Sequence, residues 1–412
     1  EIMFAYLTKS SERKGQLSFL FILHLHRYSG LWVLDQNCPL LVQYAYFLYA
    51  KSTLTVMHIF AITIFMDIYL NRDDMSVTTD DGCIFAGMFV VIFKAMNFQF
   101  RRERIGRLIE ETLKCANDLC EFSSDFYGFS LLGFLLTVAL LLFSPPHSGL
   151  PIRAKYPFDT NISPWREIGF SIETVAISSG VAAIVASDSI MAFLFSIVTL
   201  QFDILNINFE KCTGKLRTNN KYNTNQINSD TKSTSSHHCS ITTVFTNVTA
   251  NTLNGFTSQY KRFLQFHQRL IFLVNDHNKI FSWSMFVQMF SSTSIICLTS
   301  FQAVGGQSTN IIKFGIYLSA AISQLFYVCW LGNELTTSSS FVEKSQWLSE
   351  WQHEHFHDVA QLLMLSLIFS RQSLQVKAGV FYVLSLETFI GIMRGSYSFF
   401  TLLNNMHSVG GR

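Results

Sequence analysis

The segment FYGFSLLGFLLTVALLLF, residues 126–143, carries no charged side chain and predicts one membrane-spanning helix. A helix needs about 20 mostly apolar residues to cross the hydrocarbon core of a bilayer. Six further segments meet this criterion, namely residues 39–69, 82–100, 167–205, 281–301, 311–332 and 381–403. The sequence therefore predicts an all-α integral membrane protein with seven transmembrane helices. A shorter apolar run, 359–369, is expected to extend the seventh helix inward.

The composition supports this fold class and argues against several others. The chain has 412 residues, of which 49% are hydrophobic and 14% are charged, whereas soluble domains average about 25% charged residues. A formal net charge of +2 argues against a nucleic-acid-binding protein, which needs a strongly basic surface. The eight cysteines form no C-x-x-C pair, so neither a zinc finger nor a disulfide scaffold is indicated.

The distribution of Lys and Arg predicts the orientation of the chain, because these residues accumulate on the cytoplasmic side. Of the 30 basic residues, 21 lie in the segments that seven spans place on one side: 1–38, 101–125, 206–280 and 333–380. These segments are therefore expected in the cytoplasm, and the tail 404–412 is expected outside. This orientation is the inverse of that of a G-protein-coupled receptor.

The predicted organisation follows from these spans. Helices one to four occupy 39–205, helices five and six occupy 281–332, and helix seven occupies 381–403. The Asn-, Ser- and Thr-rich stretch 211–258 lies in the cytoplasmic loop. Because such a stretch buries too little apolar surface to offset its ordering entropy, we expect a flexible insert there.

Two segments carry the strongest resemblance to a known family: QLFYVCWLGNELT (324–336) and LSLETFIGIMRGSYSFFTLL (384–403). Further matching segments are GLWVLD (30–35), YPFD (156–159), SPW (163–165), SDSIMAFLFSIVTLQFDIL (187–205) and HNKIFSWSMFVQMFSSTSIICLTSFQ (277–302). Together these dispersed segments resemble the insect odorant receptors of the odour-tuning class. The chain departs from the family at Arg394-Gly395, where Lys and Thr or Ala are usual.

The resemblance implies a function and a set of partners. Such receptors are odour-gated, nonselective cation channels in the plasma membrane of olfactory sensory neurons. A tuning subunit joins the shared odorant co-receptor in a heterotetramer, and the seventh helices line the central pore. The region 333–380 would belong to a cytoplasmic anchor that holds the subunits together. The resemblance implies a small volatile ligand and no cofactor.

The family geometry also selects candidate residues. The odorant is expected in the outer half of helices two to six, in an apolar site with a few polar groups. The candidates are Phe85, Met88, Phe89, Leu136, Leu140, Phe143, Thr174, Ile177, Ser178 and Tyr317. The pore candidates Ser396, Phe400, Leu403 and Asn404 have helical spacing, and apolar rings of this kind can close a pore by dewetting. Both patterns also suit ordinary packed or lipid-facing helices.

Ionisable residues inside predicted spans default to functional hypotheses because their burial is costly. Six residues qualify: Lys51, Lys94, Glu173, Asp188, Glu387 and Arg394. For Lys51 and Lys94 the alternative is that the long side chain reaches the interface. For Asp188 and Glu387 we favour a structural buried polar group, and Asp188 could brace the helices through hydrogen bonds.

One catalytic pattern competes with the receptor interpretation. Residues 353–357, His-Glu-His-Phe-His, contain H-E-x-x-H. On one helix, His353 and His357 would share a face and could bind Zn²⁺, with Glu354 as the general base of a membrane protease. The short pattern lies inside the family resemblance, so we favour a structural helix and no metal site. The sequence also leaves open a homomeric chemoreceptor channel. A gustatory receptor is a third possibility, but the seventh-helix signature of that family, T-Y followed by an apolar run and Q-F, is absent.

Overall fold

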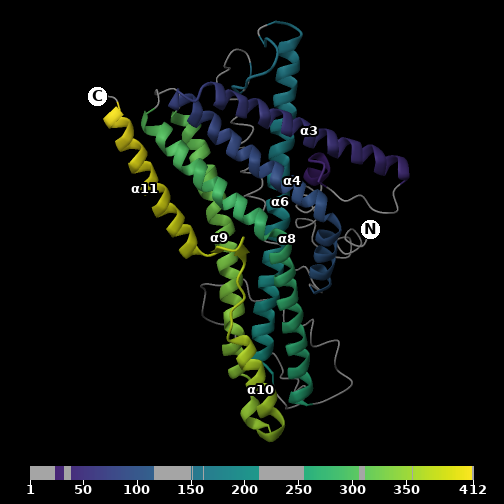
Figure 1. Ribbon diagram of the computed structural model, residues 1–412. Helices are drawn as coiled ribbons and strands as arrows, with labels where there is room; N and C mark the ends of the chain where they lie inside the picture. Colours follow the sequence, from purple (N-terminus) through teal and green to yellow (C-terminus); the bar gives the residue numbers. More distant parts are fainter. Residues whose placement is uncertain are drawn as a thin grey trace, which may run out of the picture.

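The computed structural model describes residues 24–31, 39–115, 150, 152–160, 162–212, 255–305, 311–354 and 356–410 (Figure 1). Its long helices are α3 (Leu40–Leu70), α4 (Met75–Cys115), α6 (Trp165–Glu210), α8 (Phe256–Gly305), α9 (Ile311–Trp347) and α11 (Leu386–Gly410). The shorter elements are the 3-10 helix η3 (Trp351–His353), α10 (Phe356–Ser370) and the strands β1 (Lys377–Ala378) and β2 (Tyr382–Val383). The predicted helix at 126–143 lies outside the described residues.

The long helices agree with the predicted all-α membrane fold. Within the described ranges, α3, α4, α6, α8 and α9 are long and apolar enough to cross a membrane. Each contains one of the predicted spans, but α8 and α9 continue well beyond them. α8 begins at Phe256 and α9 ends at Trp347, whereas the predicted spans are 281–301 and 311–332.

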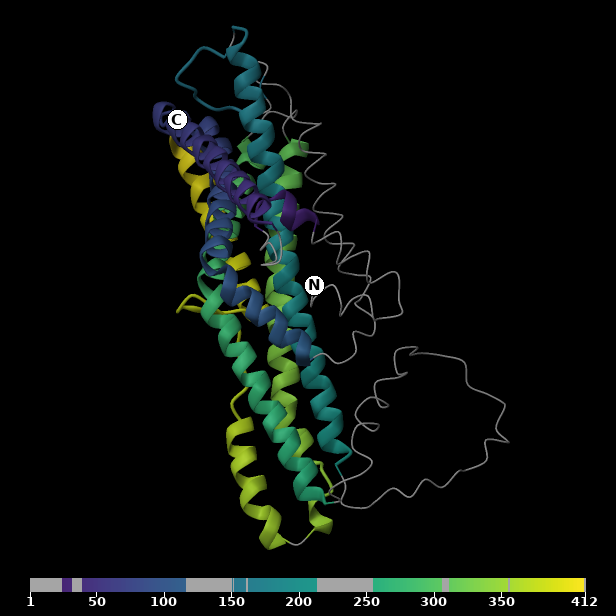
Figure 2. The same cartoon turned by 90° about the vertical axis from the view of Figure 1, so that its right-hand side faces the viewer.

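The helices form an elongated bundle around α6. Figures 1 and 2 show α6, α8 and α9 running side by side toward α10, while α11 lies along one side of the bundle. The most extensive contacts join α4 to α8 and α6 to α9, and α11 packs chiefly on α8 and α9. Small buried residues on α6, including Gly180, Ala183 and Ala186, allow neighbouring helices to approach closely.

The start of the seventh helix differs from its prediction. The range 381–403 was expected to be helical, but Tyr382 and Val383 form β2, which pairs with β1 in an antiparallel hairpin. α11 begins only at Leu386, where the hydroxyl of Ser385 accepts a hydrogen bond from the Thr388 N–H at 3.2 Å. The apolar run 359–369 forms the separate helix α10 rather than an inward extension of α11. Apolar content therefore predicted that a helix forms here, and a serine N-cap decides where it starts.

Candidate functional site

The α4 candidates occupy different environments. Met88 is buried, Phe85 is half-buried with its ring 5.8 Å from that of Phe65, and Phe89 is 49% exposed. A Cβ added to Gly180 of α6 would lie 3.9 Å from the Met88 sulfur. α4 and α6 therefore meet at Met88 and Gly180, and Phe89 points away from this contact to the surface of the chain.

The remaining pocket candidates are half-buried where the structure describes them. Thr174, Ile177 and Ser178 lie on the outer half of α6, and Tyr317 lies near the start of α9. The Ser178 hydroxyl accepts a hydrogen bond from Tyr28 at 3.2 Å. The third-helix candidates lie outside the described residues: Leu136, Leu140 and Phe143.

A buried ion pair lies deeper in the bundle. Lys94 of α4 donates a hydrogen bond to the Oδ1 atom of Asp188 on α6, and the two residues are 1% and 8% exposed. The alternative interpretation, in which the Lys94 side chain reaches the membrane interface, is therefore wrong, because Asp188 compensates its charge inside the bundle. Gln324 of α9, which the sequence reasoning missed, donates to the other carboxylate oxygen at 2.7 Å. The sequence does show Gln324 as the single amide side chain in the predominantly apolar run 311–332.

A small cavity adjoins this network. Its volume is about 10 Å³, and its walls come from α6, α8 and α9. The polar residues that line it are Asp188, Gln324 and Tyr327; Met191, Phe195, Met285 and Val328 are among the apolar ones. A cavity of this size has room for about one water molecule.

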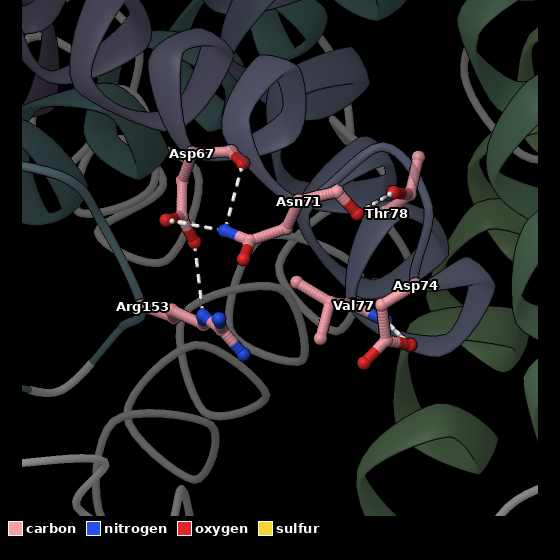
Figure 3. Close-up of polar contacts among 6 residues, drawn as sticks. All are labelled: Asp67, Asn71, Asp74, Val77, Thr78 and Arg153. Atoms are coloured by element: carbon pink, nitrogen blue, oxygen red, sulfur yellow. Dashed lines mark hydrogen bonds and ion pairs between the residues drawn. The ribbon is translucent and has the colours of Figure 1, made fainter.

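A second polar cluster lies at the C-terminal end of α3 (Figure 3). Asp67 accepts a hydrogen bond from the Asn71 amide at 3.0 Å and forms an ion pair with Arg153 at 2.9 Å. Ile152, next to Arg153 in the loop before α6, donates its backbone N–H to the carboxylate of Glu173 on α6 at 3.0 Å. Residues 152–153 of this loop thereby tie α3 to α6. Figure 3 also shows Asp74, the residue before α4, accepting a hydrogen bond from the backbone N–H of Val77 in the first turn of that helix.

The pore candidates lie on α11, which has one covered and one open face. Ser396 is buried, and its carbonyl accepts a weak hydrogen bond from the Cys297 thiol of α8 at 3.9 Å. Phe400 is half-buried, whereas Tyr397 is 68% exposed. Leu403 and Asn404 belong to α11, but their side chains lie outside the described part of the structure. Glu387 and Arg394 are exposed, so the interpretation of Glu387 as a buried polar group is wrong.

The hairpin before α11 is fastened to α8 by four hydrogen bonds. Asn278 donates to the Gln375 carbonyl at 2.9 Å and accepts from the Lys377 N–H at 3.0 Å. Ser282 accepts from the Gly379 N–H at 2.8 Å, and its hydroxyl donates to the Gly379 carbonyl at 3.0 Å. Gly379 has a φ of +65°, which favours glycine at this turn. The sequence reasoning missed these contacts because they join residues about a hundred positions apart.

The H-E-x-x-H pattern does not lie on one helix. His353 ends the short 3-10 helix η3, and Glu354 is extended, with φ −99° and ψ 162°. His357 lies in the first turn of the next helix, α10. The shared helical face that a zinc site would need is therefore absent. Among the described residues, no group of three His, Cys, Asp or Glu side chains is arranged to hold a metal ion.

Comparisons with known proteins agree on one family. The profile described as "7tm Odorant receptor" matches residues 114–397, which is more than half of the chain. Odorant receptor Or1 of Anopheles gambiae is 30% identical over 35% of each chain. Odorant receptor 83a of Drosophila melanogaster is 24% identical over 82% of this chain and 83% of its own length.

A solved structure has the same fold. The insect olfactory receptor OR5 from Machilis hrabei aligns with a TM-score of 0.74 at 14% identity, over 94% of this chain and 97% of that one. The same receptor in complex with eugenol aligns with a TM-score of 0.67 at 15% identity, over 95% of this chain and 98% of that one. At these identities the likeness shows the shared fold.

Proposed function

Because the chain belongs to the 7tm odorant receptor family, we propose that it is the odour-tuning subunit of a ligand-gated, nonselective cation channel. In this proposal it assembles with the odorant co-receptor into a heterotetramer in the plasma membrane of an olfactory sensory neuron. The cytoplasmic N-terminus and the extracellular C-terminus follow from the distribution of basic residues. The family, rather than the lack of a metal cluster among the described residues, argues against the zinc protease.

The open face of α11 is the observation that supports the channel most directly. α11 packs on α8 and α9 with one side and leaves Ile390, Tyr397, Phe399 and Leu402 exposed by 47–68%. A helix with such a face, at the edge of the bundle in Figure 1, needs lipid, a neighbouring subunit or a pore beside it. We place the pore along this open side. Phe400, half-buried and one turn beyond the buried Ser396, borders it, and Leu403 and Asn404 lie about one turn further on.

The covered face of α11 suits transmission of a ligand signal. Ser396 contacts α8 near Cys297, and the hairpin at the start of α11 is bonded to α8 at Asn278 and Ser282. α8 also contacts α4, where the pocket candidate Met88 lies. An odorant that binds one arrangement of α4, α6 and α8 more tightly would therefore shift the position of α11.

Odour-evoked current tests the proposal. The chain is expressed in heterologous cells with and without the co-receptor and challenged with a broad volatile panel. Current that requires both subunits is the expected result. Current from this chain alone would contradict the heterotetramer and favour a homomeric channel. Silence in both cases, with surface expression verified, would refute the channel.

A further inference from the structure

The buried network of Lys94, Asp188 and Gln324 joins three helices in the interior of the bundle. Lys94 donates to one oxygen of the Asp188 carboxylate, and Gln324 donates to the other at 2.7 Å. An ion pair is costly to keep inside a membrane protein, so a structural brace alone could be replaced by apolar residues. Ionisable groups at such positions most often serve a binding or transport function.

The depth of the network places it beneath the expected odorant site. Gly82 is the first residue of the predicted span 82–100, and Lys94 lies about 18 Å further along α4, at 1.5 Å of rise per residue. Lys94 therefore lies inward of the middle of that predicted span. The outer-half candidates Met88 and Ile177 precede Lys94 and Asp188 on the same two helices. The network therefore lies at the inner limit of the outer-half site.

The adjoining cavity offers polar and apolar contacts together. Asp188, Gln324 and Tyr327 line it beside Met191 and Met285, and its volume is about 10 Å³. That volume admits one group of the size of an oxygen atom. The methionines can repack around the apolar body of a ligand, because the Met side chain is unbranched and flexible.

The chemistry of the lining selects the polar group. Lys94 and Asp188 neutralise each other, so a charged ligand would remain uncompensated in a buried site. An ionised carboxylate such as that of Asp188 only accepts hydrogen bonds, and the Gln324 amide both donates and accepts. A hydroxyl matches this pair because it donates and accepts as well. An ether or ketone oxygen only accepts, so it could take a hydrogen bond from the Gln324 amide but would offer no donor to the Asp188 carboxylate.

We propose that Asp188 and Gln324 form the hydrogen-bonding floor of the odorant site and bind the hydroxyl group of a volatile alcohol. Lys94 is the positioning residue that holds the Asp188 carboxylate toward the cavity. The inference rests on the proposed odorant receptor function and names its ligand class. A site that hydrogen-bonds a substrate hydroxyl discriminates strongly against an analogue without it, because its buried polar groups lose their partner.

Ligand binding to the full chain, purified in lipid nanodiscs, tests the inference. Thermal stabilisation is titrated with hexanol, octanol and decanol, and with the methyl ether and the alkane that match each alcohol in length. Each alcohol that fits should bind at least about tenfold more tightly than its ether. Gln324→Leu should abolish this preference. The matched control is Ser323→Ala on the same helix, since Ser323 is exposed and bonds to its own helix at Ser319.

The possible outcomes test the proposed ligand class separately from the proposed channel function. Equal binding of alcohol and ether, or no binding of any alcohol, would overturn the inference even if odours evoke current. An alcohol preference without current would contradict the channel and leave the ligand class in place. The double variant Lys94→Met with Asp188→Leu removes the pair without leaving an uncompensated charge. It should lose the preference too, so the result does not depend on the folding of Gln324→Leu.

Discussion

The contact between α9 and the start of α11 gives a quantitative test of the fold. A Cβ added to Gly332 would lie 2.5 Å from the Leu384 Cβ and 2.6 Å from the Leu384 carbonyl oxygen. Carbon atoms in contact prefer about 3.5–4.0 Å, so the Leu384 backbone must move by about 1 Å in Gly332→Ala. Overpacking of this kind costs about 1–3 kcal/mol.

The same helix offers a matched control. Gly315 of α9 has open space around its added Cβ, with no heavy atom within 4 Å. Alanine is favoured over glycine inside a helix by about 1 kcal/mol, and this gain applies to both variants. The difference between Gly332→Ala and Gly315→Ala therefore isolates the steric cost, which we expect at about 1–3 kcal/mol.

Thermal unfolding of both variants in the same detergent measures the difference. Gly332→Ala should melt several degrees below Gly315→Ala. It should also alter basal or odour-evoked current, because Leu384 directly precedes the N-cap Ser385 of α11. A Gly332→Ala protein that melts at or above the temperature of Gly315→Ala would refute the close approach of α9 to Leu384.

Three further predictions concern the pore, the loop before α6 and a buried thiol. Phe400→Ala should raise basal current or change ion permeability, because it opens an apolar constriction; patch-clamp recordings with neither change would remove Phe400 from the gate. Arg153→Met should lower the melting temperature by leaving the buried Asp67 unpaired, at a cost of about 1 kcal/mol because Arg153 is 44% exposed. Adding Asp67→Asn should restore it, and no recovery would contradict the ion pair. Burial, and then the carboxylates of Glu354 and Glu350, raise the pKa of Cys212 from 9.0 to about 12. The folded thiol stays protonated where the unfolded one ionises, so stability is lost as pH rises from about 9 toward 12. Alkylation followed by mass spectrometry at about pH 9, near the ordinary thiol pKa, should leave Cys212 unmodified until the protein is denatured, and rapid labelling of the folded chain would contradict its burial.

The candidate site was only partly accessible to sequence reasoning. Met88 lies at the contact between α4 and α6, whereas Phe89, adjacent in sequence, is exposed. Neighbouring residues on a helix point about 100° apart, so family geometry could select the segment without fixing the rotation of each side chain. Gln324 was missed for a related reason, because a single amide in an apolar helix acquires meaning only from what it faces.

The H-E-x-x-H pattern shows that a local motif can also suggest a site that the fold does not form. His353 and His357 would share a face if residues 353–357 formed one helix, but the chain turns extended at Glu354. The spacing of a motif carries chemistry only in the backbone conformation that the motif assumes. Here the extended connection between η3 and α10 places His353 and His357 on two different helices.

The sequence by itself determined that this chain crosses a membrane and which segments can do so. This property can be read along the chain alone, because bilayer thickness sets the length that an apolar run must have to cross the membrane. Only the tertiary structure decided that Lys94 pairs with Asp188, that Gln324 completes the network, and that a hairpin bonded to α8 precedes α11. These contacts join residues more than ninety positions apart, and their existence depends on the rotation and approach of packed helices, which no local pattern encodes.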